Sequence, residues 1–236
     1  MALSSDLTEE VLQAALPTRA VRTYEAVVST ASVAHGWANG DAPDGAVVVA
    51  GQQLSPRGHA GRPLTMSPGK GLGFSLVMWP PLEAEREGWL YSVVLVALAD
   101  VCGAGATIRW PDELHRGGEM VAAAGVTTGL DGGGVQWAIA DVLLPGAEPP
   151  RTDLLARILD AIEARAKAPA SAVLEDYDQR CTTLGEQVRA RLRAGTGPSL
   201  QGRAISTLED GALVLEVPDR RKVAVRPQDV RQLQEV

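Results

Sequence analysis

The chain has 236 residues, with 22 Lys and Arg against 29 Asp and Glu, and a formal net charge of −7. This acidic balance argues against non-specific nucleic-acid binding, which needs a basic face, and aromatic residues at 4% are too few for a base-stacking platform. Hydrophobic residues at 45% and charged residues at 22% are typical of a globular protein with a sizeable core.

Targeting signals and metal-binding patterns are missing from the sequence. The first 16 residues carry three acidic side chains where a secretory signal would have positive charge, and the apolar run 89–99 is too short to span a bilayer. Cys102 and Cys181 lie far apart, and three isolated histidines form no zinc pattern. We therefore expect a cytoplasmic protein with reduced thiols, no membrane association and no metal site.

The first half of the chain alternates strand and helix patterns. The expected elements are a short helix before Pro17, a strand at 21–29, a helix at 30–39, a buried strand at 46–50, an irregular stretch at 51–73, a strand at 74–79, an apolar helix at 87–102 and a strand at 106–110. Residues 111–118 are predicted to form a polar turn region.

The second half begins with β-strand patterns and ends with them. The expected elements are strands at 121–128 and 134–144, a Pro-rich connection at 145–150, helices at 152–168 and about 171–180, an ambiguous segment at 184–193, a loop at 194–198 and an alternating β pattern at 202–235. The final β pattern spans about 40 residues, so we expect it to pack on the main domain for stability.

Polar residues with ligand-binding potential stand at two predicted strand ends. Ser29 and Thr30, at a strand–helix junction, could donate hydrogen bonds to a ligand or could simply cap the helix. Gln53, at the end of the buried strand, could orient a polar ligand or satisfy loop backbone groups. The residues alone leave both alternatives open.

The irregular stretch combines glycine with arginine at Arg57, Gly58, Gly61 and Arg62. Glycines let a backbone approach a ligand closely, and guanidinium groups bind phosphate oxygens in pairs. The same composition also suits an ordinary surface loop with solvated arginines.

A second group of charged residues follows the strand at 106–110. Arg109 could pair with a phosphate or stack on Trp110. Asp112 and Glu113 could hold Mg²⁺, or they could be solvated acids of a turn.

The order of these elements and motifs resembles the biotin protein ligase family and its lipoate ligase-like relatives over nearly the whole chain. Ser29-Thr30 stands where the family has Ser-Thr-Asn, and residues 50–53 and 57–62 resemble its Gln-containing strand end and Gly-Arg-Gly loop. Residues 109–113 resemble its Lys-Trp-Pro-Asn-Asp segment, and residues 177–185 with the β tail resemble its C-terminal cap. The N-terminus is too short for the winged helix-turn-helix that makes some members repressors.

The resemblance implies a fold and a chemistry. The fold is α+β, with a ligase-like domain of mixed sheet and packed helices at 1–193 and an SH3-like β-barrel at 194–236. Family enzymes use ATP and Mg²⁺ to adenylate biotin and then pass it to a lysine of a biotin carboxyl carrier domain, and pairing of sheet edges would allow a homodimer. The implied ligand-binding residues are Ser29, Thr30, Gln53, Arg57, Gly58, Gly61, Arg62 and Trp110, with Arg109 as the catalytic candidate.

The sequence departs from the family where charge matters most. The family's adenylation lysine is replaced by Glu119 or Met120, and the nearest candidates to compensate are Lys70 and Arg116. The family's Asn in its Gly-Ile-Gly-Ile-Asn-Val strand is Asp141. Loss of a preorganised cation typically costs about 10²–10³ in rate. Three hypotheses follow: a ligase of reduced activity, a non-catalytic binder of biotin, another small acid or a carrier protein, and a scaffold without a ligand.

Overall fold

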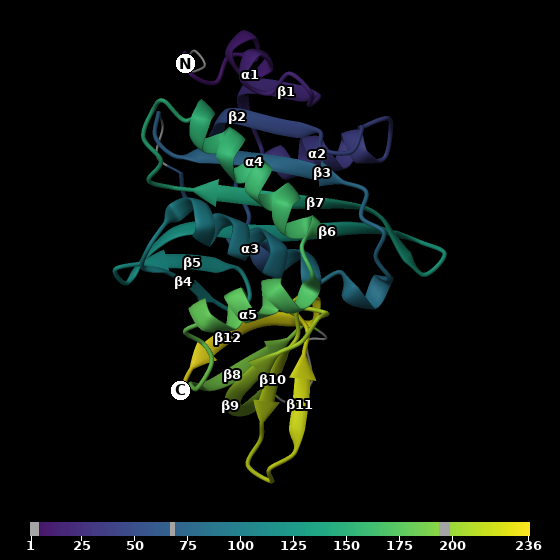
Figure 1. The fold of residues 1–236 in the computed structure, drawn as a ribbon, viewed down its shortest axis with the longest axis vertical. Helices are drawn as coiled ribbons and strands as arrows, with labels where there is room; N and C mark the ends of the chain where they lie inside the picture. The colour runs from purple at the N-terminus through teal and green to yellow at the C-terminus, as the bar shows by residue number, and fades with distance from the viewer. Residues whose placement is uncertain (1–4, 67–68, 194–198) are drawn as a thin grey trace.

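The computed structural model describes residues 5–66, 69–193 and 199–236 (Figure 1). The helices are α1 (Glu9–Ala15), α2 (Thr30–Ala38), α3 (Trp89–Cys102), α4 (Thr152–Lys167) and α5 (Ala170–Arg180). The strands are β1 (Val21–Val27), β2 (Val47–Gln53), β3 (Leu72–Met78), β4 (Ala106–Arg109), β5 (Glu113–Arg116), β6 (Glu119–Asp131), β7 (Gly134–Leu144), β8 (Gln187–Leu192), β9 (Leu200–Thr207), β10 (Leu213–Glu216), β11 (Lys222–Val225) and β12 (Val230–Glu235).

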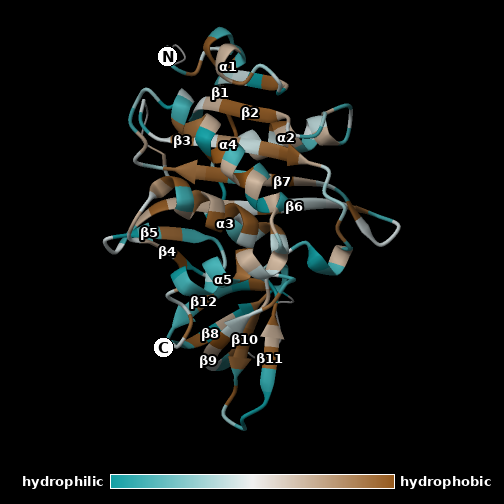
Figure 2. Cartoon of the chain, viewed as in Figure 1, coloured by the Kyte–Doolittle hydropathy of each residue, from teal (hydrophilic) through white to brown (hydrophobic). Residues whose placement is uncertain are grey.

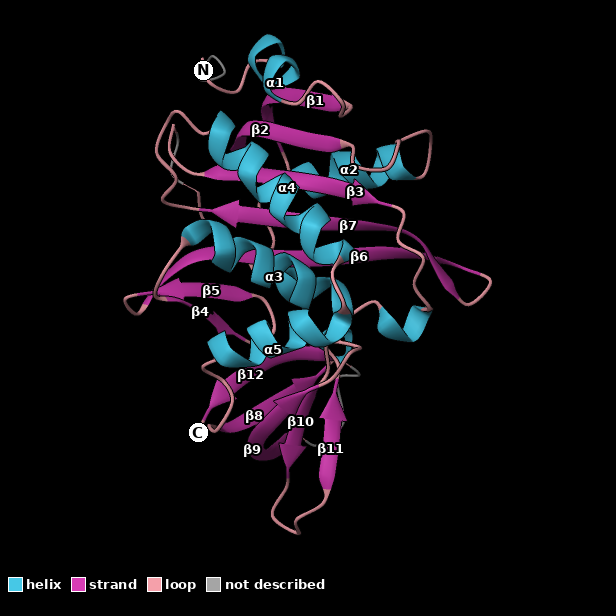
Figure 3. Cartoon of the chain, in the orientation of Figure 1, coloured by secondary structure: helices cyan, strands magenta, loops and turns pink. Residues whose placement is uncertain are grey.

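A mixed seven-stranded sheet organises the larger part of the molecule (Figure 3). Its strand order is β1-β2-β3-β7-β6-β5-β4, in which β1 and β2 are parallel and the other neighbours are antiparallel. This mixed sheet with packed helices confirms the predicted fold class.

The central strands are apolar on both sides because helices cover both sheet faces. Val47 and Val49 of β2 face the core that α1, α3 and α4 share with the sheet, whereas Val48 faces Ala34 and Trp37 of α2. Successive side chains of a strand point to opposite faces, so a continuous valine run suits a strand buried on both sides. The hydrophobic colouring of β2 and β7 follows this arrangement (Figure 2).

Helix α3 is the most buried helix on the sheet face that α1 and α4 also cover. Eleven of its 14 residues, Trp89 to Ala99, are buried. Glycines border it on both sides, and Gly103 at its C-terminus has a φ of 84°, a conformation that favours glycine. None of the helices in the described part of the chain is long and apolar enough to cross a membrane.

Residues 113–116 form strand β5, so the prediction of a turn across 111–118 is wrong in this part. Leu114 is fully buried against the core, while His115 and Arg116 pair with Met120 and Glu119 of β6. One apolar residue among polar ones gives a weak strand pattern. Here the neighbouring strands on both sides supply the pairing that local propensity does not.

A separate five-stranded sheet follows at the C-terminus, with the order β11-β10-β9-β8-β12 and antiparallel pairs throughout. Strand β8 lies in the segment that the sequence left ambiguous. The predicted loop at 194–198 lies outside the described residues, and the domain division at 193 stays a prediction.

A buried ion pair connects the N-terminus to the start of α4. Arg151, which is 1% exposed, donates hydrogen bonds from Nε and Nη2 to the carboxylate of Asp6 at 2.9 and 2.8 Å. Its third donor, Nη1, binds the carbonyl of Gly71 at 2.7 Å. The charge of Arg151 is tolerated in the interior because its donors have partners.

Candidate functional site

Ser29, Thr30 and Gln53 meet at the junction of β1, α2 and β2. The Ser29 hydroxyl oxygen caps α2 by accepting from the backbone N–H of Ser32 at 3.2 Å. The amide N–H and hydroxyl of Thr30 both donate to Oε1 of Gln53, at 2.9 and 3.2 Å. Capping and a polar cluster therefore coexist, and Gln53 is oriented by Thr30 rather than by solvent.

The Gln53 side chain crosses β3 at Gly73. A Cβ at position 73 would lie 2.2 Å from Nε2 of Gln53, well inside van der Waals contact. Glycine at this position leaves the space that the amide needs.

Asp141 extends the polar cluster across the sheet. On β7 it pairs in register with Ser75 of β3, whose hydroxyl oxygen lies 2.5 Å from Oδ1 of Asp141 and 2.7 Å from the hydroxyl oxygen of Thr30. Burial raises the pKa of Asp141 to about 7, and the hydrogen bond from Ser75 opposes this shift. The carboxyl group is therefore largely protonated in mildly acidic solution.

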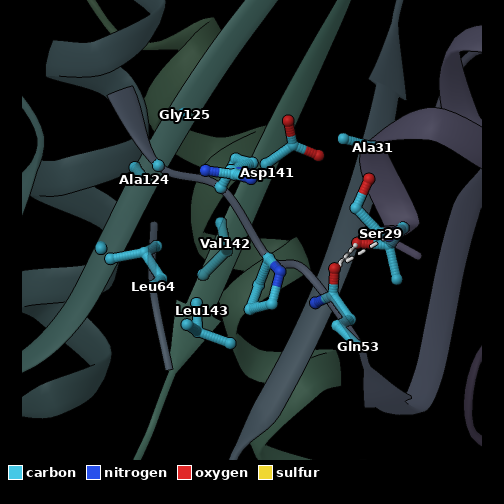
Figure 4. Close-up of a pocket in the computed structure, with 14 residues that line it drawn as sticks. Ser29, Ala31, Gln53, Leu64, Ala124, Gly125, Asp141, Val142 and Leu143 are labelled. Atoms are coloured by element: carbon cyan, nitrogen blue, oxygen red, sulfur yellow. Dashed lines mark hydrogen bonds between the residues drawn. The ribbon is translucent and has the colours of Figure 1, made fainter. Parts of the chain in front are cut away.

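A narrow pocket opens beside this cluster (Figure 4). Ser29, Gln53 and Asp141 line it together with apolar groups of β6 and β7. Pro56 and Leu64 close it, and both belong to the Gly/Arg loop, the segment 54–64 that follows β2. Its free volume of about 20 Å³ is the size of one water site.

A larger pocket of about 740 Å³ adjoins the narrow one. The two pockets share Ala31, Arg57, Gly58, Gly125 and Asp141. The larger pocket is also lined by Gly61 and by Arg193 and Arg231. These two arginines belong to the C-terminal unit, which is the five-stranded sheet with its connecting turns.

Three guanidinium groups make the larger pocket suited to an anion. Arg57, Arg193 and Arg231 line it, and none of them forms a salt bridge within the described residues. Arg57 donates from Nη1 to the carbonyl of Gly61 at 3.3 Å. Their charges are available to a phosphate, for which arginine is well adapted.

His59 fixes the Gly/Arg loop without contributing charge. Its Nε2 donates to the carbonyl of Val230 on β12 at 2.7 Å, so Nδ1, at 3.0 Å, accepts from the Tyr91 hydroxyl. The pKa of His59 is lowered to about 4, mainly by burial and also by the nearby Arg193 and Arg62, while the hydrogen bond to Val230 opposes this shift. His59 is therefore a neutral, buried imidazole that adds no positive charge to the pocket.

Arg62 fastens the other end of the same loop. It binds Asp112 at 3.0 Å and also pairs with Glu113, whose other oxygen contacts His115 at 2.7 Å. Burial raises the pKa of Asp112 to about 7, against the opposing effect of Arg62. Asp112 and Glu113 are therefore engaged by Arg62, and this pair does not fit the Mg²⁺ role that the sequence suggested.

Arg109 and Trp110 lie outside the two adjoining pockets. They line a third pocket of about 610 Å³ next to β12, where Arg109 binds Glu235 at 2.5 Å. Trp110 is buried, and its indole N–H donates to the carbonyl of Gly211 at 3.0 Å. In this structure Trp110 therefore joins the large sheet to the C-terminal unit, and Arg109 does not contact the narrow pocket.

The positions considered for the missing lysine lie elsewhere. Glu119 and Met120 begin β6, opposite Arg116 and His115, and neither lines the narrow or the larger pocket. Lys70 pairs with Glu148 at 2.9 Å, and Arg116 donates to the carbonyl of Cys102 at 3.0 Å. Among the described residues, no lysine lines these two pockets, and Glu119 does not line them either.

Four lining or supporting residues were absent from the sequence-based site. Ser75, Tyr91, Arg193 and Arg231 carry no motif of their own in the sequence. Arg231 belongs to a polar alternating strand that looks solvated, and only the tertiary fold brings it beside Arg57. Asp141 could have been predicted as a site residue from the sequence, because an acid in an otherwise apolar strand is costly unless it has a partner.

Comparisons with known proteins agree with the fold. No family model matches the sequence. The bifunctional ligase/repressor BirA of Bacillus spizizenii is 23% identical over 231 residues, covering 83% of this chain and 69% of that protein. The biotin protein ligase of Aquifex aeolicus, solved with biotin and ATP, has a TM-score of 0.70 at 17% identity, covering 92% of this chain and 99% of that one.

A second solved structure gives the same result. The biotin–acetyl-CoA carboxylase synthetase of Helicobacter pylori, solved with biotinylated ATP, has a TM-score of 0.62 at 17% identity, covering 88% of this chain and 100% of that one. The chain therefore has the fold of the biotin protein ligases. It is similar to these ligases at low sequence identity, as a divergent biotin protein ligase-like protein would be.

Proposed function

We propose that the chain binds biotin in the narrow pocket and ATP in the larger pocket, and joins them slowly into biotinyl-adenylate. The observation that carries this proposal is the shared wall of the two pockets, where Arg57 and Asp141 face both. A carboxylate entering from one side would meet a phosphate entering from the other. Solved structures of the same fold contain biotin with ATP, which supports the assignment of the two ligands.

The chemistry would proceed in two steps. A biotin carboxylate oxygen attacks the α-phosphorus of ATP, and the bond from that phosphorus to the bridging oxygen breaks to release pyrophosphate. Negative charge builds on the phosphorus oxygens, and Arg57, Arg193 and Arg231 would stabilise it. The amine of a carrier-protein lysine then attacks the acyl carbon, loses a proton and releases AMP.

The rate should be low because no lysine lines the pockets and His59 is neutral. The narrow pocket must also widen, since about 20 Å³ does not admit the two fused rings of biotin. The loop that carries Pro56 and Leu64 would have to move.

The proposed reaction also needs Mg²⁺ and a carrier domain, and it is compatible with a dimer. No group of three or more His, Cys, Asp or Glu residues suited to a metal occurs within the described residues. Mg²⁺ would therefore have to be held mainly by the nucleotide phosphates, as it often is in such sites. A carrier domain would have to approach the shared wall of the pockets. A homodimer could form by pairing of the edge strands β1 and β4.

A non-catalytic binding protein is the second candidate function. It is favoured by the fixed loop, in which Arg62 is ion-paired and His59 is buried against Val230. A loop held by its own side chains would bind a small carboxylic acid or a carrier protein without promoting phosphoryl chemistry.

Isothermal titration with biotin, alone and with Mg·ATP, separates the two candidates. We expect biotin to bind alone, to bind more tightly with Mg·ATP, and to cause slow release of pyrophosphate that a coupled assay detects. Biotin binding with no effect of ATP would favour the non-catalytic candidate. Absence of binding in both titrations would contradict both assignments of biotin.

Gly73→Ala should weaken biotin binding about tenfold, corresponding to about 1.4 kcal/mol. The added methyl would clash with Nε2 of Gln53 and so disturb the two hydrogen bonds from Thr30. Titration with biotin measures the change. Gly146→Ala is the matched control, because nothing lies within 4 Å of a Cβ there. Equal affinities for the two variants would show that the position of Gln53 does not matter for binding.

A further inference from the structure

Asp141 stands at the wall shared by the two pockets and has no cationic partner. It lines both pockets, and among the described residues it forms no salt bridge. Within the described part of the chain, the carboxyl group of Asp141 is hydrogen-bonded to Ser75 alone. A carboxylate placed in this way would repel the anionic groups that we propose for both pockets.

The hydrogen-bond chain beside Asp141 allows two directions. When Asp141 is protonated, it can donate to Ser75, Ser75 to Thr30, and Thr30 to Oε1 of Gln53, so that every hydroxyl donates once. When Asp141 is ionised, Ser75 must donate to it, and Thr30 must then turn its proton from Gln53 to Ser75 to keep the chain bonded. One proton therefore reverses two hydrogen bonds and decides whether the Thr30 hydroxyl donates to Gln53 or to Ser75.

We propose that this chain takes its anionic ligand together with a proton at Asp141, and that Asp141 thereby selects for carboxylate ligands in acidic rather than alkaline solution. This inference rests on the proposed function, because it assigns anions to the two pockets. The protonated carboxyl group removes the repulsion and directs the chain of hydroxyl protons toward Gln53. Above the titration range of Asp141, the two negative charges would oppose each other at the shared wall.

Other ionisable groups around Asp141 do not explain such a pH dependence. On the loop, Arg57 stays charged, and the pKa of His59, about 4, lies below the relevant range. Burial raises the pKa of Tyr91 on α3 well above its usual value, so it stays protonated. Arg193 and Arg231 of the C-terminal unit also stay charged.

Glu87 is the remaining titratable group in the larger pocket. Its carboxylate accepts a hydrogen bond from the hydroxyl of Thr128. Because Glu87 lines the pocket proposed for ATP, the matched control is instead Asp131→Asn, which removes an exposed carboxylate at the end of β6, outside both pockets.

The test is the pH dependence of biotin affinity between pH 5.5 and 8.5, measured by titration calorimetry. We expect the dissociation constant of the unmodified chain to rise by up to tenfold per pH unit above about pH 7, as loss of one bound proton requires. Asp141→Asn should make this profile flat, and Asp131→Asn should keep the slope. Biotin methyl ester, which has no carboxylate, should show little slope with the unmodified chain. A slope that persists in Asp141→Asn, or a flat profile in the unmodified chain, would overturn the proposal.

A second measurement needs no biotin and so separates this inference from the proposed function. If biotin does not bind at any pH, Mg·ATP becomes the anionic probe, and its affinity should follow the same pH dependence. In the ligand-free protein, ¹³C NMR can follow the carboxyl carbon of Asp141, whose resonance is identified because it disappears in Asp141→Asn. This resonance should titrate with a midpoint above pH 6. A midpoint below pH 5 would overturn the proposal even if biotin binds.

Discussion

Replacement of Arg57 by alanine is expected to lower biotin-dependent pyrophosphate release by about 10²–10³-fold, the usual loss for one preorganised group that stabilises a transition-state charge. Among the described residues, Arg57 is the only arginine that lines both adjoining pockets, so we expect it to act where the carboxylate and the α-phosphate would meet. It has no salt bridge within the described residues that would hold its charge elsewhere. Biotin affinity in the absence of ATP should change much less than the rate.

Arg221→Ala is the matched control for this experiment. Arg221 pairs with Asp219 in the exposed turn before β11 and lines neither pocket, so its removal changes net charge equally but should leave the rate unchanged. Arg57→Lys should recover part of the rate, since it keeps the charge but loses the planar fork that binds two phosphate oxygens. Pyrophosphate release that is equally fast in the unmodified chain and in Arg57→Ala would refute the assignment of Arg57.

Local patterns in the sequence predicted most of the individual elements, and the resemblance to the biotin protein ligases predicted how they are assembled. The valine run of β2, the continuous apolar stretch of α3 and the amphipathic pattern of α4 each determine an element by themselves. Strand β5 was missed because its pairing partners, not its own residues, decide its conformation. The same holds for β8, whose neighbours β9 and β12 come later in the chain.

The candidate site was only partly predictable for a related reason. Ser29, Thr30 and Gln53 stand at strand ends, where sequence reasoning can foresee that side chains will converge. The supply of positive charge could not be foreseen. Arg62 lies in the loop that the sequence predicted to bind a ligand, but it is ion-paired with Asp112 and Glu113. Arg231 instead lines the larger pocket from the last strand, β12. Whether an arginine is paired or available depends on neighbours distant in sequence.

The replacement of the family's lysine by Glu119 would matter most if its carboxylate lay beside the bound phosphates, and the structure places it elsewhere. Glu119 is exposed at the start of β6 and does not line the pockets. The acid that lines both pockets is Asp141, on the neighbouring strand. The electrostatic cost of divergence from the family is therefore concentrated at Asp141, where protonation can remove it.

Asp141→Asn is expected to stabilise the folded protein at alkaline pH, by about 4 kcal/mol at most. The folded-state pKa of Asp141 is about 7 against an ordinary value of 3.8, so between these limits the folded chain binds a proton that the unfolded chain has released. The contribution of this group to the free energy of unfolding therefore falls as pH rises through this range, and it stays low above pH 7. Asparagine removes the dependence, while its amide can still bond to Ser75.

The measurement is urea denaturation of both proteins at pH 5 and pH 8, because a difference between two proteins cancels the other titrating groups. Asp112, whose pKa burial also raises to about 7, changes stability in the same direction, and His59, with a pKa lowered to about 4, acts in the opposite direction below pH 6.5. Both are present in each protein. The advantage of Asp141→Asn should be greater at pH 8 than at pH 5 by about 3 kcal/mol, corresponding to two pH units of titration. An advantage that is the same at both pH values would mean that Asp141 is already ionised at pH 5, and the hydrogen-bond chain would then run from Thr30 toward Asp141 throughout.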